Sequence, residues 1–126
     1  MGWLSDHFKT EELSCKCCND IKISHELVRV LERLRSNFFD TPITVTNCYR
    51  CQAHNMEIGG SPSSLHMVGW AVDFYFKGLS IKDTYDKMKK MHDDCFILKG
   101  GLGVYFKKGF YHIDIGKHRY WDDKKE

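Results

Sequence analysis

The sequence predicts a small α+β domain in which helices pack on a mainly antiparallel sheet. Two observations support this fold class. Segments with helical spacing and caps lie early and in the middle of the chain, and the last two apolar runs are joined as a hairpin. The 126 residues are enough for one hydrophobic core and too few for two, so we expect a single domain over residues 1–126.

The expected helices are marked by caps and by apolar spacing. Thr10–Leu13 reads as a short helical turn with acidic residues in its first turn. Ser24 can cap a longer helix over residues 24–39, which Pro42 stops. Four apolar side chains of that helix fall on one face: Leu27, Leu31, Leu34 and Phe38. Residues 49–58 hold a short helix, and residues 80–92 begin with a capping-box pattern.

Four segments have the composition of strands. Residues 43–46 are β-branched throughout, and residues 70–76 are apolar except for Asp73. Residues 101–106 and 110–115 are joined by Lys-Lys-Gly, where Gly109 suits the positive φ that a tight hairpin turn requires. The sequence therefore predicts a sheet that ends in a hairpin.

Composition excludes several function classes. Hydrophobic residues make up 42% of the chain and aromatic residues 13%, which is typical of a packed globule. A net charge of +2 leaves no footprint for duplex nucleic acid, so we expect no nucleic-acid partner. We also expect a monomer. No apolar run approaches the roughly 18 residues of a membrane span. Residues 1–7 lack a basic region followed by an apolar stretch, so no signal peptide is expected.

Six cysteines are many for a chain of this size. Five of them form two clusters: Cys15, Cys17 and Cys18, then Cys48 and Cys51. The two clusters could supply a second metal site with four thiolates. They could equally be packed thiols with one disulfide that ties the N-terminal segment to residues 48–51. The sequence leaves both interpretations open.

Three polar residues interrupt otherwise apolar surroundings. Asp73 lies inside an apolar strand, His112 lies in the last strand, and His66 lies in the loop that enters the first of these strands. Each alone is more often a solvated or paired side chain. Together, two imidazoles and one carboxylate suit zinc and leave a fourth position for water. Zinc lowers the pKa of such a water to roughly 7.

Residues 64–73 read Ser-Leu-His-Met-Val-Gly-Trp-Ala-Val-Asp and match the pattern S-x-H-x-x-G-x-A-x-D. On this segment the sequence resembles the zinc D-Ala-D-Ala carboxypeptidase-like metallopeptidases, the M15 peptidase family. The likeness extends to residues 8–13, to residues 46–60 with Tyr-Arg-Cys, His-Asn and Gly-Gly, and to residues 100–114. The resemblance implies an α+β fold like that of the D-Ala-D-Ala peptidases and the Hedgehog signalling domain.

The resemblance also implies roles for particular residues. His66, Asp73 and His112 would be the zinc ligands, and Arg50 would polarise the scissile carbonyl and steady the oxyanion. Ser64 would bind substrate or hold the loop that carries His66. The implied activity is hydrolysis of amide bonds in peptidoglycan peptides, as a carboxypeptidase or an endopeptidase. The implied place of action is the bacterial cell wall or periplasm, and small phage endolysins, made in the cytoplasm and then released, are one such type.

One departure from the family pattern concerns the general base. Several members carry an acid three residues before the last histidine, where this chain has Gly109. Asp114 is the best local candidate for the base, and it could instead orient His112 from behind. His54 and His118 are weaker candidates. A non-catalytic zinc-binding module on the same scaffold is the alternative function.

Overall fold

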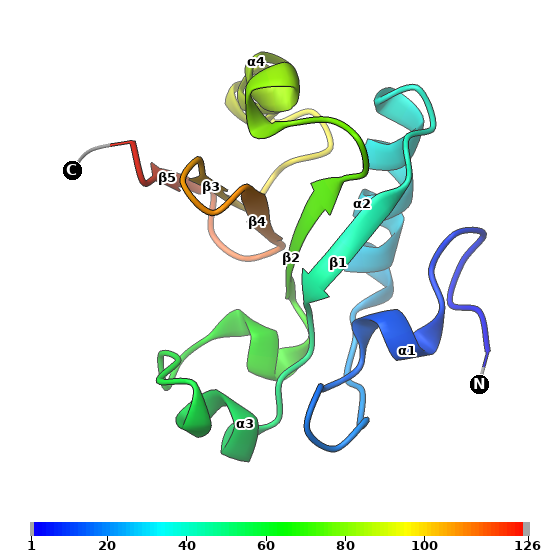
Figure 1. Ribbon diagram of the computed structural model, residues 1–126, viewed down its shortest axis with the longest axis vertical. Helices are drawn as coiled ribbons and strands as arrows, with labels where there is room; N and C mark the ends of the chain where they lie inside the picture. Colours follow the sequence, from blue (N-terminus) through cyan, green and yellow to red (C-terminus); the bar gives the residue numbers. More distant parts are fainter. Residues whose placement is uncertain (1, 125–126) are drawn as a thin grey trace.

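The structure is a computed structural model that describes residues 2–124. Helices are interspersed with the first two strands, the last three strands follow one another, and all strands form one five-stranded sheet in the order β1-β2-β4-β3-β5 (Figure 1). Neighbouring strands are antiparallel except β3 and β5, which are parallel. The elements are α1 (Thr10–Leu13), α2 (His25–Asn37), β1 (Ile43–Asn47), α3 (Gln52–Glu57), the 3-10 helix η1 (Leu65–Val68), β2 (Ala71–Phe76), α4 (Ile81–Asp93), β3 (Gly101–Tyr105), β4 (Phe110–Asp114) and β5 (Arg119–Asp122). The predicted α+β class with a mainly antiparallel sheet is confirmed.

The long helices begin at their predicted caps. The Ser24 side chain accepts a hydrogen bond from the Glu26 amide, and Ser80 forms a capping box with Asp83. Helix α2 ends two residues before the expected residue 39. It stops because Phe39 and Asp40 adopt left-handed φ values of 59° and 58°, which an α-helix cannot contain.

The two faces of the sheet differ in polarity. Val72, Phe74, Tyr111 and Ile113 are buried in one cluster with apolar residues of α2 and α4. Because side chains alternate along a strand, the residues between them point to the opposite face. Asp73 on β2 therefore lies on the face away from these helices, as a direct consequence of the apolar alternation.

Two elements were not predicted from the sequence: η1, which was expected to be a loop, and strand β5. Strand β5 runs parallel to β3 at the sheet edge, with Gly103 opposite Trp121 in the register. The strand has only four residues and begins with a charged one, so its alternation is too short to stand out from the polar segment before it.

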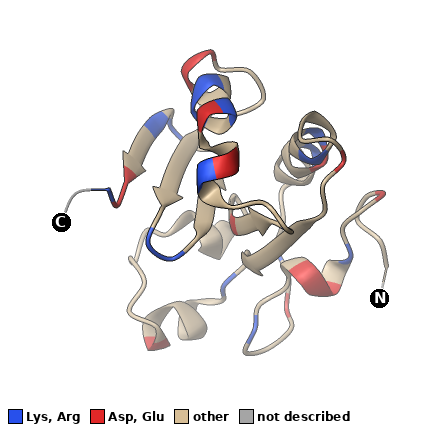
Figure 2. Cartoon of the chain, turned by 45° about the horizontal axis from the view of Figure 1, so that its top comes forward, with Lys and Arg blue, Asp and Glu red and all other residues tan. Residues whose placement is uncertain are grey.

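None of the helices in residues 2–124 combines the length and the apolar character needed to span a membrane. Basic and acidic side chains alternate along α4 instead of separating by sign (Figure 2).

Candidate metal centre and pocket

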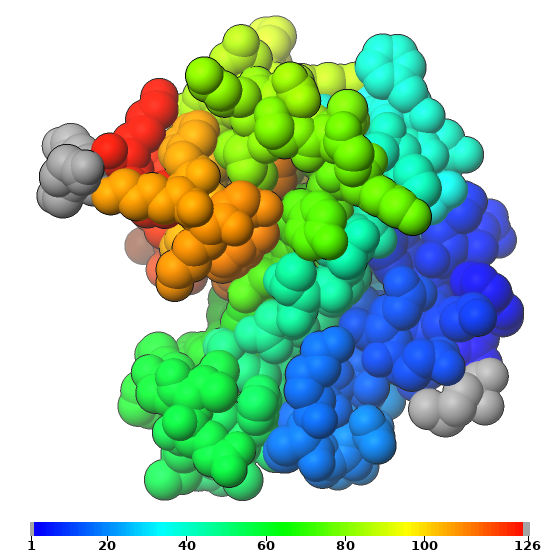
Figure 3. All heavy atoms as spheres, in the orientation of Figure 1, coloured from blue at the N-terminus to red at the C-terminus, as the bar shows by residue number. Residues whose placement is uncertain are grey.

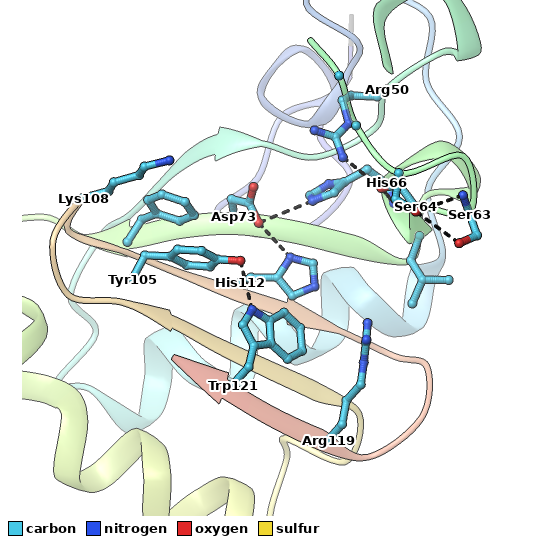
Figure 4. Close-up of a pocket in the computed structure, with 15 residues that line it drawn as sticks. Arg50, Ser63, Ser64, His66, Asp73, Tyr105, Lys108, His112, Arg119 and Trp121 are labelled. Atoms are coloured by element: carbon cyan, nitrogen blue, oxygen red, sulfur yellow. Dashed lines mark hydrogen bonds and ion pairs between the residues drawn. The ribbon is translucent and has the colours of Figure 1, made fainter. Parts of the chain in front are cut away.

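Three elements bring His66, Asp73 and His112 together on the polar face of the sheet. Asp73 and His112 are direct cross-strand partners on β2 and β4, and His66 comes from η1, which leads into β2. An oxygen of Asp73 lies 2.9 Å from His112 Nδ1 and 3.4 Å from His66 Nε2 (Figure 4). One donor atom from each residue lies within 4.8 Å of the other two. The structure thus places the three predicted ligands in one cluster.

The ring of His66 is held in one orientation by the backbone. Its Nδ1 donates a hydrogen bond to the Cys48 carbonyl at 2.7 Å, in a buried position. The other nitrogen, Nε2, faces Asp73 and keeps its lone pair for that side. A carbonyl partner on the far nitrogen is the arrangement that fixes the tautomer of a ligating histidine.

His112 is placed between two carboxylates. Its Nε2 donates to Asp114 at 2.9 Å, on the side of the ring opposite Asp73. The Asp114 side chain is 0% exposed, and its other oxygen accepts bonds from the amides of Gly101 and Gly116. Asp114 therefore lies behind His112 rather than beside the cluster.

Two glycines of β3 make room for this arrangement. A Cβ atom on Gly101 would lie 2.5 Å from an oxygen of Asp114, and one on Gly103 would lie 2.5 Å from the Trp121 ring. Such distances are far below van der Waals contact. Glycine is therefore required at these two positions of β3, because the Asp114 carboxylate and the Trp121 indole pack directly against the backbone there.

The electrostatics of the cluster favour an ionised carboxylate. Burial opposes the charge of Asp73, but when the two rings are protonated, hydrogen bonds from His112 and His66 outweigh it and lower the pKa of Asp73 to about 2. Burial likewise opposes the charge of His112, and the flanking carboxylates raise its pKa. Two imidazoles and an ionised carboxylate are a donor set that divalent transition metals bind. The residues present therefore fit a metal ion.

A pocket of about 620 Å³ opens over this cluster. Figure 3 shows the hollow between the green segment that contains α3 and the orange hairpin of β3 and β4. Arg50, Lys108 and Arg119 supply positive charge to its lining, and Asp73 is the only carboxylate among the described lining residues. In Figure 2 the turn between β3 and β4 and the start of β5 are basic. The pocket is suited to an anionic ligand.

Arg50 lines the pocket from the segment after β1. Its guanidinium donates to the Ser64 hydroxyl at 2.8 Å, and its backbone amide donates to the His66 carbonyl. The same hydroxyl accepts from the His66 amide and caps η1. Burial lowers the pKa of Arg50, and the Asp73 carboxylate opposes this effect. Ser64 therefore connects the arginine to the loop that carries His66.

Sequence reasoning missed the far wall of the pocket. Trp121 donates its indole N–H to the Tyr105 hydroxyl at 2.9 Å, and its ring centroid lies 5.1 Å from that of His112. Lys108 and Arg119 lie at the rim (Figure 4). The aromatic pair in residues 119–122 was the available signal, since a tryptophan near a polar strand face is often part of a binding wall.

The weaker candidates for a base lie away from the pocket. Neither His54 nor His118 is among its described lining residues. His54 pairs with Glu57 on α3, and His118 stacks on His92 with ring centroids 4.0 Å apart. Gly109 has the positive φ of 81° that was predicted for the hairpin turn.

The cysteines divide into two groups in space. Cys15, Cys17, Cys18 and Cys51 converge, with one sulfur from each within 4.8 Å of the others. Cys48 does not join them: it is buried in the core, and burial raises the pKa of its thiol to about 12. All six cysteines are free thiols in the structure.

A His-Asp-His donor set beside a buried arginine, on the polar face of a small sheet, is an arrangement typical of metal-dependent hydrolases. A family model described as Peptidase M15 matches residues 6–114, so the chain belongs to the M15 peptidase family.

Curated relatives share part of this chain. It is 29% identical over 85 residues to peptidoglycan L,D-endopeptidase MepK of Escherichia coli K12, and equally so to those of Escherichia coli O157:H7 and Shigella flexneri. The match covers 64% of this chain and 43% of each relative, so the chain spans less than half the length of these proteins.

Proposed function

We propose that this protein is a zinc-dependent peptidase that hydrolyses amide bonds in the peptides of bacterial peptidoglycan. The observation that carries the proposal is the convergence of His66, Asp73 and His112 at the base of a pocket that also contains Arg50. Membership of the M15 peptidase family supports the same reaction class.

His66, Asp73 and His112 are the residues that would hold the zinc ion. A zinc ion with three protein ligands supplies Lewis acidity and a nucleophilic water at neutral pH. Arg50 stays charged at neutral pH and presents fixed N–H donors to the same pocket. In this proposal Arg50 binds the scissile carbonyl oxygen and stabilises the charge that develops on it.

Asp114 has a positioning role in this proposal. It accepts the Nε2 proton of His112 and thereby keeps Nδ1, the nitrogen that faces Asp73, available as a ligand. Its buried position behind the ring supports this role over that of a base, for which the carboxylate would have to reach into the pocket. Ser64 acts on Arg50 and on the His66 loop, as its two hydrogen bonds indicate.

The proposed substrate follows from the charge of the pocket. Peptidoglycan peptides carry free carboxylates, and Arg50, Lys108 and Arg119 offer them three cations around the candidate centre. The relatives named above are peptidoglycan L,D-endopeptidases, which supports a cut within such peptides over the removal of a terminal residue. The proposed place of action is the bacterial cell wall.

A digest of purified peptidoglycan tests the proposal. The protein should release muropeptide fragments, identified by mass spectrometry, and a chelator should abolish the release until zinc is restored. His66→Ala should be inactive even with added zinc. Release that persists in chelator, or in His66→Ala, would show that the candidate centre is not the active site.

One observation favours a second function, a zinc-binding module without catalysis. Among the described residues, Asp73 is the only carboxylate that lines the pocket, so none is free there to serve as a base. Zinc bound at the His66 site with no release of fragments under any metal condition would support this alternative.

A further inference from the structure

A second cluster of metal-ligating side chains lies outside the pocket. Cys15, Cys17 and Cys18 occupy one turn before α2, and Cys51 immediately precedes α3. The Cys17 sulfur lies 3.6 Å from that of Cys15 and 3.4 Å from that of Cys51. All four sulfurs lie within 4.8 Å of one another. None of these thiols takes part in the proposed reaction.

The separations match a four-thiolate site. With zinc–sulfur bonds of about 2.3 Å, the sulfurs of a tetrahedral site lie roughly 3.8 Å apart. The two separations from the Cys17 sulfur, 3.6 Å and 3.4 Å, are slightly shorter than this value, and no pair of the four sulfurs is more than 4.8 Å apart. A disulfide would join two sulfurs at about 2.0 Å and would leave the remaining pair with no reason to converge on it. Four mutually close sulfurs therefore indicate a shared ligand rather than a pairing.

The backbone around the sulfurs is arranged to hold them. The Cys51 amide donates to the Cys15 sulfur and the His54 amide donates to the Cys51 sulfur, both at 3.4 Å. The turn itself is closed by a bond from the Asn19 amide to the Cys15 carbonyl, with Asn19 in the left-handed region at φ 64°. Amide donors to sulfur are the partners that orient thiolate ligands around a metal.

We infer that Cys15, Cys17, Cys18 and Cys51 bind a structural zinc ion in a closed site with four thiolate ligands. A tetrahedral set of four thiolates selects zinc or iron among common metals, and four protein ligands leave no position for substrate. The observations behind this site are separate from those behind the proposed activity, since none of the four cysteines lines the pocket.

The position of the site indicates its role. Cys51 follows Arg50 directly, and the Arg50 amide is bonded to the His66 carbonyl. A zinc ion here would fasten the N-terminal segment to the short stretch that carries the arginine. The Tyr49 amide also donates to the Leu13 carbonyl and so links the same two segments.

Metal content of the reduced protein tests the inference. Elemental analysis should find about two zinc ions per chain in the unmodified protein and about one in Cys17→Ser. Cys95→Ser is the matched control, because Cys95 lies outside the cluster, and it should keep the full content. His66→Ala should lose one zinc ion from the other site, which separates failure of that site from failure of this one.

Cobalt spectroscopy tests the same site without a cysteine variant, so the test remains valid even if Cys17→Ser folds poorly. Cobalt(II) bound to His66→Ala should show the thiolate-to-metal charge-transfer band in the near ultraviolet, since only the thiol site remains. The inference is overturned if that band is absent, if Cys17→Ser retains all its zinc, or if the site holds iron. A mass two hydrogens lower per bridge in protein purified without reductant, together with no thiol-bound metal, would overturn it in favour of disulfides.

Discussion

Asp114→Asn is the substitution that discriminates best among the roles open to this carboxylate. One oxygen of Asp114 accepts the amides of Gly101 and Gly116, and the other accepts His112 Nε2. An asparagine has a single acceptor oxygen, and the amides of Gly101 and Gly116 would both donate to it. Its NH₂ group is then left facing Nε2.

That exchange acts on His112 through its tautomer. A donor opposite Nε2 makes this nitrogen an acceptor, so the neutral ring carries its proton on Nδ1, the nitrogen that faces Asp73. A protonated Nδ1 cannot bind a metal. We therefore expect zinc affinity at the His66 site to fall about ten- to a hundredfold, which corresponds to about 1.4–2.7 kcal/mol.

Competition against a chromophoric chelator measures this affinity. The zinc ion that is lost in His66→Ala defines the zinc that belongs to this site. Asp94→Asn is the control, because it deletes the same charge from an exposed carboxylate that pairs with Lys90 on α4. Normal zinc affinity with lost turnover would refute the positioning role and identify Asp114 as the base. Full activity and full affinity would leave Asp114 without either role.

Three further predictions concern other parts of the molecule. Arg50→Lys should keep its zinc, but its rate of peptide hydrolysis should fall about a hundredfold or more, which is the typical rate loss when one oxyanion donor is removed. Unchanged turnover would show that Arg50 has only a structural role. Gly69→Ala should lower the unfolding midpoint in urea more than Gly109→Ala, because both have positive φ but only at Gly69 would a Cβ meet a backbone oxygen, 2.0 Å away; equal losses would contradict this. Glu32→Gln should destabilise the fold by about 1 kcal/mol at pH 7. Burial opposes the Glu32 charge, but hydrogen bonds from Ser5 and His7 lower its pKa, so this stabilisation is present above about pH 4.5 and is lost as the pH falls. Urea unfolding of both forms should converge in acid, and a constant difference would contradict the assignment.

The sequence predicted those parts of the fold that local signals determine. Ser24 and Ser80 begin their helices because each offers a side-chain oxygen to a free amide of the first turn. Asp73, the one charged residue in an otherwise apolar segment, marked a position of β2 that needs a polar partner or solvent. Strand β5 was not predicted because it is defined by its pairing with β3, a long-range contact, and its four residues are too few to show an alternating pattern.

The candidate centre shows the same division. The sequence motif predicts the metal-ligating residues, whereas the backbone groups that orient them are determined by how the segments pair in the fold. The carbonyl that orients His66 belongs to Cys48, 18 positions away, and the amide that holds Asp114 belongs to Gly101. Backbone groups have no residue-specific signal in a sequence. Only the tertiary pairing shows which carbonyl or amide meets which side chain.

The four residues after β1 connect the two candidate metal sites. The Cys48 carbonyl orients His66, Arg50 enters the pocket, and the Cys51 sulfur joins the thiol cluster. Because Cys51 directly follows Arg50, whose amide is bonded to the His66 carbonyl, we expect a shift of Cys51 to move Arg50 relative to His66. Loss of metal from the thiol cluster should therefore lower turnover through Arg50 while zinc remains at the His66 site, and a Cys17→Ser protein with one zinc ion and reduced hydrolysis is the combination that this linkage requires.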